Sequence, residues 1–337
     1  MKNLVKIFAV LLVSFNYFSI SFANSIPSSF ADLAERLMPS VVNISTTTTV
    51  TTRSNPLPFE FPPGSPFEDM FGTPQQRQTS ALGSGFIIDE EGIVITNNHV
   101  IQGAQDIVVR VNGDKDYKAK VLGADAGMDL AVLKIESDEK FKPVNFGNSD
   151  KARIGDWVIA IGNPFGLGGT VTAGIISARN RSIGLSRYED YIQTDASINQ
   201  GNSGGPLFNM AGDVIGINTA ILGQSGSIGI GFAIPSNSAQ KVIKQLIEFG
   251  ETKRGWLGVR IQVVDQGIAD AENLDKPRGA LVASVAENSP SDKGGIKPGD
   301  IILEFDGKPI NEMKELPKIV AETDVGKKVI VKVWRNK

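Results

Sequence analysis

Short apolar runs separated by turn residues recur along most of this chain. Residues 92–96, 107–111, 157–163 and 214–218 are examples, and 36 glycines and 17 prolines punctuate the sequence. Runs that are short and bounded by glycine are typical of β-strands rather than long helices. The pattern therefore predicts a mostly β protein with a barrel or sandwich core. A chain of 337 residues has room for two globular domains.

One of the turns contains a serine between glycines, in Gly-Asn-Ser-Gly-Gly at 201–205. Such a turn can expose the Ser203 hydroxyl and let a substrate backbone approach closely. It can also aim the N–H groups of Gly201 and Ser203 at one point, as the oxyanion of an acyl-transfer intermediate requires. Gly201, Asn202 and Ser203 are thus the predicted oxyanion hole. Taken alone, a cluster of this kind is more often a plain loop.

The single histidine of the chain changes that balance. A serine nucleophile at neutral pH needs a positioned base, and imidazole is the usual one. His99 follows an apolar run at 92–96, and Asp129 stands at the start of another, where its carboxylate can hold the imidazole in one tautomer. The order His99, Asp129, Ser203 is that of chymotrypsin. A catalytic triad is therefore favoured over a structural histidine.

The composition excludes several other functions. The net charge of −3 gives no support for nucleic-acid binding. Without cysteine the chain can form neither disulfides nor thiolate metal sites, and one histidine does not suggest a structural zinc site. We expect no metal and no cofactor.

The first 23 residues have the features of a cleavable secretory signal. Lys2 and Lys6 precede an apolar stretch at 7–22, and small residues flank position 22. An uncleaved membrane anchor is the alternative, but the stretch is short and interrupted for a spanning helix. We expect a periplasmic protein without membrane association.

The N-terminal part of the mature chain combines a helix with a long loop. Apolar spacing predicts a helix within 25–39, followed by a strand at 41–44. A loop is predicted at 46–80, where threonines precede a segment rich in proline, glycine and phenylalanine. Its phenylalanines either form a local cluster or dock onto another subunit or an active site. Farther on, residues 107–121 are expected to form a hairpin.

The middle of the chain continues with strands and closes with a helix. Ile230, Gly231 and Phe232 lie on a predicted strand that, in a protease of this order, forms a wall of the primary specificity pocket. These side chains would make the pocket small and apolar. Residues 238–249 have helical spacing and end at Gly250, a C-cap signal.

The charged segment at 251–254 is a predicted linker and marks a domain boundary. Beyond it the chain offers two short helices and a hairpin turn at Asp306-Gly307. The helices are expected at 289–294 and 312–319, and the strands at 256–259, 280–285, 301–305 and 329–333. The predicted domains are therefore a protease domain at 24–250 and a smaller one at 251–337.

These motifs together resemble the HtrA/Deg family of extracytoplasmic serine proteases. The resemblance rests on Gly-Ser-Gly-Phe at 83–86, Thr-Asn-Asn-His-Val at 96–100, Asp-Leu-Ala-Val-Leu-Lys at 129–134, Ile-Gly-Asn-Pro-Phe-Gly at 161–166, Gly-Asn-Ser-Gly-Gly-Pro-Leu at 201–207 and Gly-Phe-Ala-Ile-Pro at 231–235. The stretch from Arg254 onward resembles a PDZ domain, including Gly-Ile-Lys-Pro-Gly-Asp at 295–300.

The resemblance implies a fold, an activity and partners. It implies a chymotrypsin-like double β-barrel followed by a PDZ domain, assembled as trimers or multiples of trimers. The implied activity is ATP-independent cleavage of misfolded or unfolded envelope proteins. His99 would be the general base, Asp129 its orienting acid and Ser203 the nucleophile.

The resemblance also assigns residues that couple the two domains. Arg181 falls where related proteases keep a loop arginine that senses PDZ or peptide binding, although a solvated loop charge is equally consistent with the sequence. Trp256, Leu257, Gly258 and Val259 resemble the PDZ carboxylate-binding loop. The backbone of that loop would receive a peptide C-terminus while the peptide adds as a strand to a sheet edge.

Two departures leave alternatives open. Quality-control members usually have two PDZ domains, whereas this sequence has one and stops directly after a predicted strand, so the PDZ domain is expected to be incomplete at its C-terminus. One alternative is a chaperone or holdase with a latent protease site. Another is a single-PDZ, membrane-anchored stress-sensor protease, against which the long phenylalanine-bearing loop argues.

Overall fold

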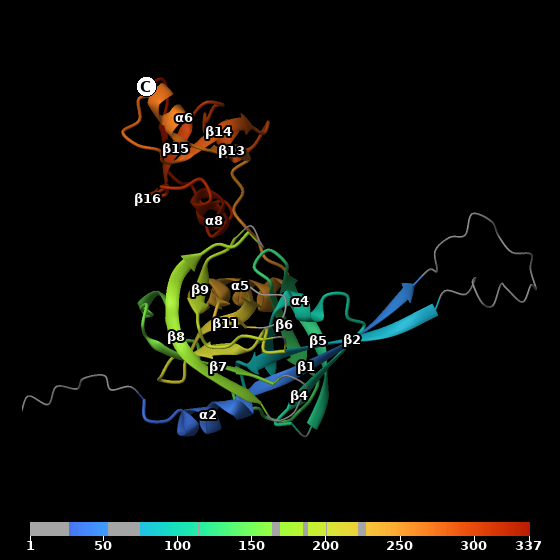
Figure 1. Ribbon diagram of the computed structural model, residues 1–337. Coiled ribbons are helices and arrows are strands. Elements are labelled where there is room, and N and C mark those ends of the chain that lie inside the picture. The colour runs from blue at the N-terminus through green and yellow to red at the C-terminus, as the bar shows by residue number, and fades with distance from the viewer. Residues whose placement is uncertain are drawn as a thin grey trace, which may run out of the picture.

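The computed structural model describes residues 27–52, 75–113, 115–163, 169–184, 188–199, 201–221 and 227–337. Within these ranges the chain forms two closed β-barrels and a separate smaller sheet. Figure 1 shows the barrels packed together and the C-terminal sheet beyond them. The mostly β, double-barrel architecture predicted from the sequence is confirmed.

The first barrel has the strand order β1-β2-β3-β6-β5-β4, with antiparallel neighbours throughout. Its strands are β1 (Val41–Thr52), β2 (Gln75–Ile87), β3 (Ile93–Thr96), β4 (Asp106–Val111), β5 (Lys115–Asp125) and β6 (Leu130–Ile135). Alternate side chains point inward, and buried Ile44, Ile87 and Leu133 belong to the core of this barrel. The predicted hairpin is confirmed by the pairing of β4 with β5.

The second barrel has the order β10-β11-β12-β9-β8-β7. Its strands are β7 (Trp157–Gly162), β8 (Thr170–Arg181), β9 (Tyr191–Thr194), β10 (Pro206–Phe208), β11 (Val214–Ile221) and β12 (Gly231–Pro235). Phe86 of the first barrel shares one buried cluster with Ile159 and Phe208 of the second. The barrels are therefore joined through a common hydrophobic core.

Short helices flank the barrels. They are α2 (Ala31–Leu37), the 3-10 turns η1 (Met38–Ser40) and η2 (Ser149–Lys151), α4 (Asn98–Ile101) and α5 (Ser236–Phe249). α2 is shorter than predicted, and the N–H of Ala31 donates to Ser29 Oγ at 3.1 Å. α5 ends as predicted, because Gly250 adopts a left-handed conformation (φ 76°) and donates its N–H to the Leu246 carbonyl at 3.0 Å.

β1 and β2 are longer than the barrel needs and continue as a two-stranded ribbon that projects from it (Figure 1). The sequence predicted a loop at 46–80, but residues 46–52 and 75–80 lie in the paired strands. Threonine is β-branched and suits extended backbone, which explains this correction. Residues 53–74, with the four phenylalanines of the predicted loop, lie outside the described ranges.

The C-terminal sheet packs against three short helices. Its strands are β13 (Val259–Val263), β14 (Ala280–Val285), β15 (Ile301–Phe305), β16 (Lys308–Pro309) and β17 (Val331–Trp334). The helices are α6 (Gln266–Ala271), α7 (Pro290–Lys293) and α8 (Glu315–Ala321). Ile302 and Phe305 from the sheet and Leu316 from α8 share one buried cluster. This domain therefore has its own core.

Some local predictions for this domain were right and others need correction. Asp306 and Gly307 both have positive φ and join β15 to β16, as the hairpin signal indicated. β13 begins only at Val259, so residues 256–258 are not strand. The sequence analysis missed α6, although the Asp265 side chain caps it by accepting the N–H of Ile268 at 2.9 Å.

Among the residues that the structure describes, no helix is both long enough and apolar enough to span a bilayer. The predicted signal segment at 1–23 lies outside those residues.

Candidate active site

The imidazole of His99 projects from α4, immediately after β3. Val100 and Ile101 are buried in the core of the first barrel and hold this short helix in place. The side chain of His99 is 47% exposed. The fold thus presents the only histidine at the surface of the first barrel, on a rigid support.

Asp129 lies in the turn between β5 and β6 and contacts His99 twice. Its Oδ1 accepts the backbone N–H of His99 at 2.8 Å, and its Oδ2 lies 2.6 Å from Nδ1 of the imidazole. The Asn97 side chain donates to the Asp129 carbonyl at 2.8 Å. A carboxylate at Nδ1 favours the tautomer with the proton there, which leaves Nε2 free to accept a proton.

Ser203 lies on a tight turn of the second barrel that needs its glycines. Gly201 and Gly204 have φ values of 102° and 83°, which L-residues with side chains rarely adopt. A Cβ on Gly204 would also lie 2.3 Å from the Ser84 carbonyl oxygen. The turn is therefore possible only with glycine at these positions.

The backbone of this turn leaves two donors available. The N–H groups of Gly201 and Ser203 make no hydrogen bond to any described residue. By contrast, the N–H groups of Gly204 and Gly205 donate to the carbonyls of Asn218 and Asn202 at 2.7 and 3.1 Å. Within the described residues, the predicted oxyanion donors are thus the N–H groups of this turn that lack an acceptor.

The Ser203 hydroxyl and the His99 imidazole are not hydrogen-bonded to each other in the part of the chain that is described. Among the described residues, the structure therefore shows the His99–Asp129 hydrogen bonds of the predicted triad but not the Ser203–His99 one. Catalytic hydrogen bonds of this type are often completed only when substrate binds.

The three predicted pocket residues differ in their surroundings. Phe232 is buried in the core between the barrels, where its ring lies 5.9 Å from that of Tyr191, whereas Ile230 is only partly buried. Gly231 faces the other way, since a Cβ there would lie 2.5 Å from Cγ1 of Ile198. Sequence reasoning missed Ile198, which is buried against Gly231 five positions before Ser203 in the chain.

The predicted carboxylate-binding residues Trp256, Leu257 and Gly258 form the loop that precedes β13. The carbonyls of Leu257 and Gly258 accept the N–H groups of Ser291 and Ala286 at 3.0 and 2.8 Å. The N–H groups of Leu257 and Gly258 donate to no residue in the described ranges. Trp256 is 64% exposed beside them. Over the ranges that the structure describes, the loop before β13 thus has two backbone N–H groups without a hydrogen-bond acceptor.

Arg181 ends β8, where its Nε donates to Gln193 Oε1 at 3.1 Å. The chain beyond it contacts the C-terminal part of the molecule at two points. The guanidinium of Arg254 lies 4.5 Å from the ring centre of Tyr188, and Lys318 of α8 forms an ion pair with Asp190. Arg181 itself reaches neither contact, but it lies on the segment that makes them.

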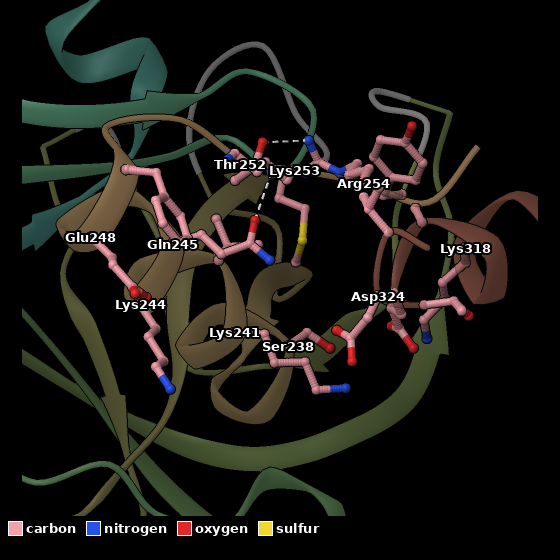
Figure 2. A pocket seen from close by; sticks show the side chains of 18 residues that line it. Ser238, Lys241, Lys244, Gln245, Glu248, Thr252, Lys253, Arg254, Lys318 and Asp324 are labelled. Atoms are coloured by element: carbon pink, nitrogen blue, oxygen red, sulfur yellow. Dashed lines mark hydrogen bonds between the residues drawn. The ribbon is translucent and has the colours of Figure 1, made fainter. Parts of the chain in front are cut away.

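A cavity of about 420 Å³ lies at this junction of the domains. Figure 2 shows that α5 supplies one wall and α8 another, with the linker residues Thr252 to Arg254 across them. Beside it, Arg254 Nη2 lies 2.5 Å from Oδ2 of Asp125, a buried carboxylate that also accepts the Met128 N–H at 2.9 Å. The linker is therefore tied to the turn that carries Asp129.

Comparisons with known proteins find relatives for both domains. Residues 83–217 match the trypsin-like peptidase domain, and residues 255–337 match the PDZ domain. A probable periplasmic serine endoprotease, DegP-like, from Marinomonas sp. (strain MWYL1) is 48% identical over 94% of this chain and 70% of its own length. A protein of the same description from Hahella chejuensis (strain KCTC 2396) is 46% identical over 91% of this chain and 67% of its own.

Two solved protease structures are also similar to this chain over most of its length. The HtrA-type protease AlgW with a decapeptide is 43% identical, with a TM-score of 0.75 over 91% of this chain and 95% of that one. The serine endoprotease from Yersinia pestis is 35% identical, with a TM-score of 0.64 over 93% of this chain and 95% of that one.

Proposed function

The chain belongs to the DegP-like serine endoproteases of the HtrA type, and on that premise we propose that Ser203, His99 and Asp129 are its nucleophile, general base and orienting acid. The observation that carries this assignment is the double contact of Asp129 with His99, at 2.8 and 2.6 Å. It orients the only imidazole of the chain, on the barrel that faces the serine turn.

The proposed reaction is acyl transfer to serine followed by hydrolysis. Ser203 Oγ attacks the scissile carbonyl while His99 Nε2 takes its proton, and the N–H groups of Gly201 and Ser203 bind the oxyanion. The imidazolium then protonates the leaving amine. Water attacks the acyl-enzyme with His99 again as base, and Asp129 stabilises the imidazolium in both halves.

The proposed substrates are exposed segments of unfolded or misfolded envelope proteins. The predicted pocket residues Ile230, Gly231 and Phe232 carry no charge, and Ile198, which is buried against Gly231, is also apolar. A small aliphatic residue before the scissile bond suits such residues better than a basic one. Because the curated relatives are named periplasmic, we place this cleavage in the periplasm.

The PDZ domain is proposed to capture peptide C-termini. The unpaired N–H groups of Leu257 and Gly258 suit a terminal carboxylate, and β13 is the edge strand beside them, to which a peptide can add. Tyr188 and Asp190, which contact the linker and α8, then connect this site to the Arg181 segment. We propose that peptide binding is sensed through these contacts, in a trimer or a multiple of trimers.

Cleavage of casein by the purified protein tests the assignment of the nucleophile. We expect Ser203→Ala to lower turnover by roughly 10⁶ while the fold is retained, taking the subtilisin triad as a guide. A hydrophobic C-terminal peptide should accelerate the wild-type protein only. Undiminished cleavage by Ser203→Ala would exclude Ser203 as the nucleophile.

A second candidate function is a holdase with a latent protease site. In the described part of the chain no hydrogen bond joins the Ser203 hydroxyl to His99, and in a latent protease that bond would form only on activation. In that case the wild-type protein would cleave casein poorly without peptide, and Ser203→Ala would still prevent aggregation of an unfolded client. Aggregation at the rate of the client alone would exclude this second function.

A further inference from the structure

Ser84, on β2 of the first barrel, contacts the serine turn of the second barrel at two points. Its hydroxyl donates to the carbonyl of Gly201 at 2.5 Å, and its backbone N–H donates to the carbonyl of Ser203 at 2.9 Å. Ser84 itself is fully buried. One residue of the first barrel therefore holds the carbonyls on both sides of Asn202.

The direction of the Ser84 hydroxyl is set by its neighbours. The N–H of Asn163 donates to Ser84 Oγ at 2.7 Å, and the carbonyl of Asn163 accepts Nδ2 of Asn43 at 2.9 Å. A serine hydroxyl has one proton and two lone pairs. Since the Asn163 amide uses one lone pair, the proton is left for Gly201.

The peptide between Gly201 and Asn202 separates the two proposed oxyanion donors. Peptide units are planar, and each neighbouring unit is linked to this one only through the φ and ψ of one Cα. Holding this unit in place therefore limits the positions open to the N–H of Gly201 before it and that of Ser203 after it. Glycine itself fixes the backbone weakly. The Ser84 hydroxyl holds the carbonyl end of the unit, and the Asn202 N–H donates to the carbonyl of Asn199 at 3.2 Å.

We propose that Ser84 is a positioning residue of the oxyanion hole. Its hydroxyl holds the Gly201–Asn202 peptide so that the N–H groups of Gly201 and Ser203 converge on one point. The hole is thus completed from the first barrel, and the docking of the two barrels sets its geometry. This inference rests on the proposed function, because it requires Ser203 to be the nucleophile.

Replacement of Ser84 by alanine should affect turnover rather than substrate binding. Ser84→Ala leaves the Gly201 carbonyl and the Asn163 N–H without a partner. We expect kcat to fall about ten- to a hundredfold, less than the hundred- to thousandfold fall for outright loss of an oxyanion donor. KM should change less than about twofold, because the oxyanion forms only after binding.

Ser236 provides a matched control. It is also fully buried, and its hydroxyl donates to the Gly147 carbonyl at 2.7 Å, but it makes no contact with the serine turn. We would measure kcat, KM and the melting temperature for Ser84→Ala and Ser236→Ala with one fluorogenic peptide. Both should melt earlier, and only Ser84→Ala should lose kcat. Equal kcat values, or a rise in KM alone, would overturn the proposal.

Ser84→Cys covers the case in which the alanine variant does not fold. It keeps nearly the same volume but supplies a weaker donor, so its kcat should lie between those of the wild-type protein and Ser84→Ala. If Ser84→Ala is unfolded, a wild-type kcat in Ser84→Cys overturns the proposal.

Ser203→Ala in the same assay separates this inference from the proposed function. If Ser203→Ala turns over like the wild-type protein, the triad assignment and the role of Ser84 both fail. If Ser203→Ala is inactive while Ser84→Ala turns over like Ser236→Ala, only the role of Ser84 fails.

Discussion

Asp129 holds His99 through both of its carboxylate oxygens, one on the backbone N–H and the other on Nδ1 of the ring. The φ of Asp129 is 55°, in the left-handed region. Aspartate adopts this conformation more readily than most residues, at a modest energetic cost. The turn therefore places the carboxylate where it fixes both the position and the tautomer of the imidazole.

Asp129→Asn should retain the fold but lose most of the activity. The amide has nearly the same shape, but it can no longer enforce the tautomer with the proton on Nδ1. We expect kcat to fall by about 10⁴, as in the equivalent chymotrypsin-type substitution. Peptide hydrolysis checks this, with Asp156→Asn as the control, because Asp156 pairs with the exposed Arg153. Equal losses in the two variants would contradict a catalytic role for Asp129.

Arg254→Ala should destabilise the protease domain. The Asp125 side chain is 1% exposed and pairs with Arg254 at 2.5 Å, so the substitution leaves a buried carboxylate without its cation. Breaking a buried pair in this way costs about 3 kcal/mol in the free energy of unfolding. Calorimetry would follow the protease-domain transition. Arg110→Ala, which breaks a more exposed pair with Asp116 in the same domain, should leave this transition nearly unchanged. Similar losses would refute the prediction.

The stability of the PDZ domain should depend on pH through Asp300. Burial raises the pKa of Asp300, but hydrogen bonds from the Arg335 side chain and the Lys297 backbone outweigh it, so the net pKa lies below the ordinary value. Such a group stabilises the fold above its unfolded pKa, about 3.9, and the contribution is lost as the pH falls through the lower folded value.

Arg335→Gln tests this dependence. At pH 7 the variant should lose about 2 kcal/mol of unfolding free energy, because its guanidinium bonds to Asp300 at 2.6 and 2.7 Å are gone. In urea titrations the wild-type and variant curves should begin to converge as the pH falls below about 4, the unfolded pKa, and meet only below the lowered folded pKa of Asp300. A difference that stays constant down to pH 2 would rule out Asp300 as its source.

Gly231→Ala should impair cleavage next to small aliphatic residues. The new Cβ would come 2.5 Å from Cγ1 of Ile198, so the buried isoleucine must move. We expect kcat/KM for a peptide with valine before the scissile bond to fall at least about tenfold. Gly267→Ala, in α6 of the PDZ domain with no contact under 3.4 Å, should leave cleavage unchanged. A wild-type value for Gly231→Ala would exclude Gly231 from the pocket.

Much of the fold could be predicted because its signals are local. Gly250 ends α5 because its own backbone adopts the left-handed conformation. Asp306-Gly307 forms a hairpin turn because both residues have positive φ values. The threonine run was misread for the opposite reason. Its strand forms only because residues 75–81 pair with it from a distant part of the sequence.

The sequence by itself determined the order of His99, Asp129 and Ser203, the glycines around the serine, and the division into two domains, because each depends on residue type and spacing. Only the tertiary structure showed that Ser84 reaches Gly201, 117 residues away, and that Gly231 packs against Ile198. Side-chain contacts of this kind form when two barrels or two strands meet. Local propensity depends on residues that are neighbours in the sequence, and it does not specify which distant residue will pack against a given side chain. Only the packed fold decides these contacts.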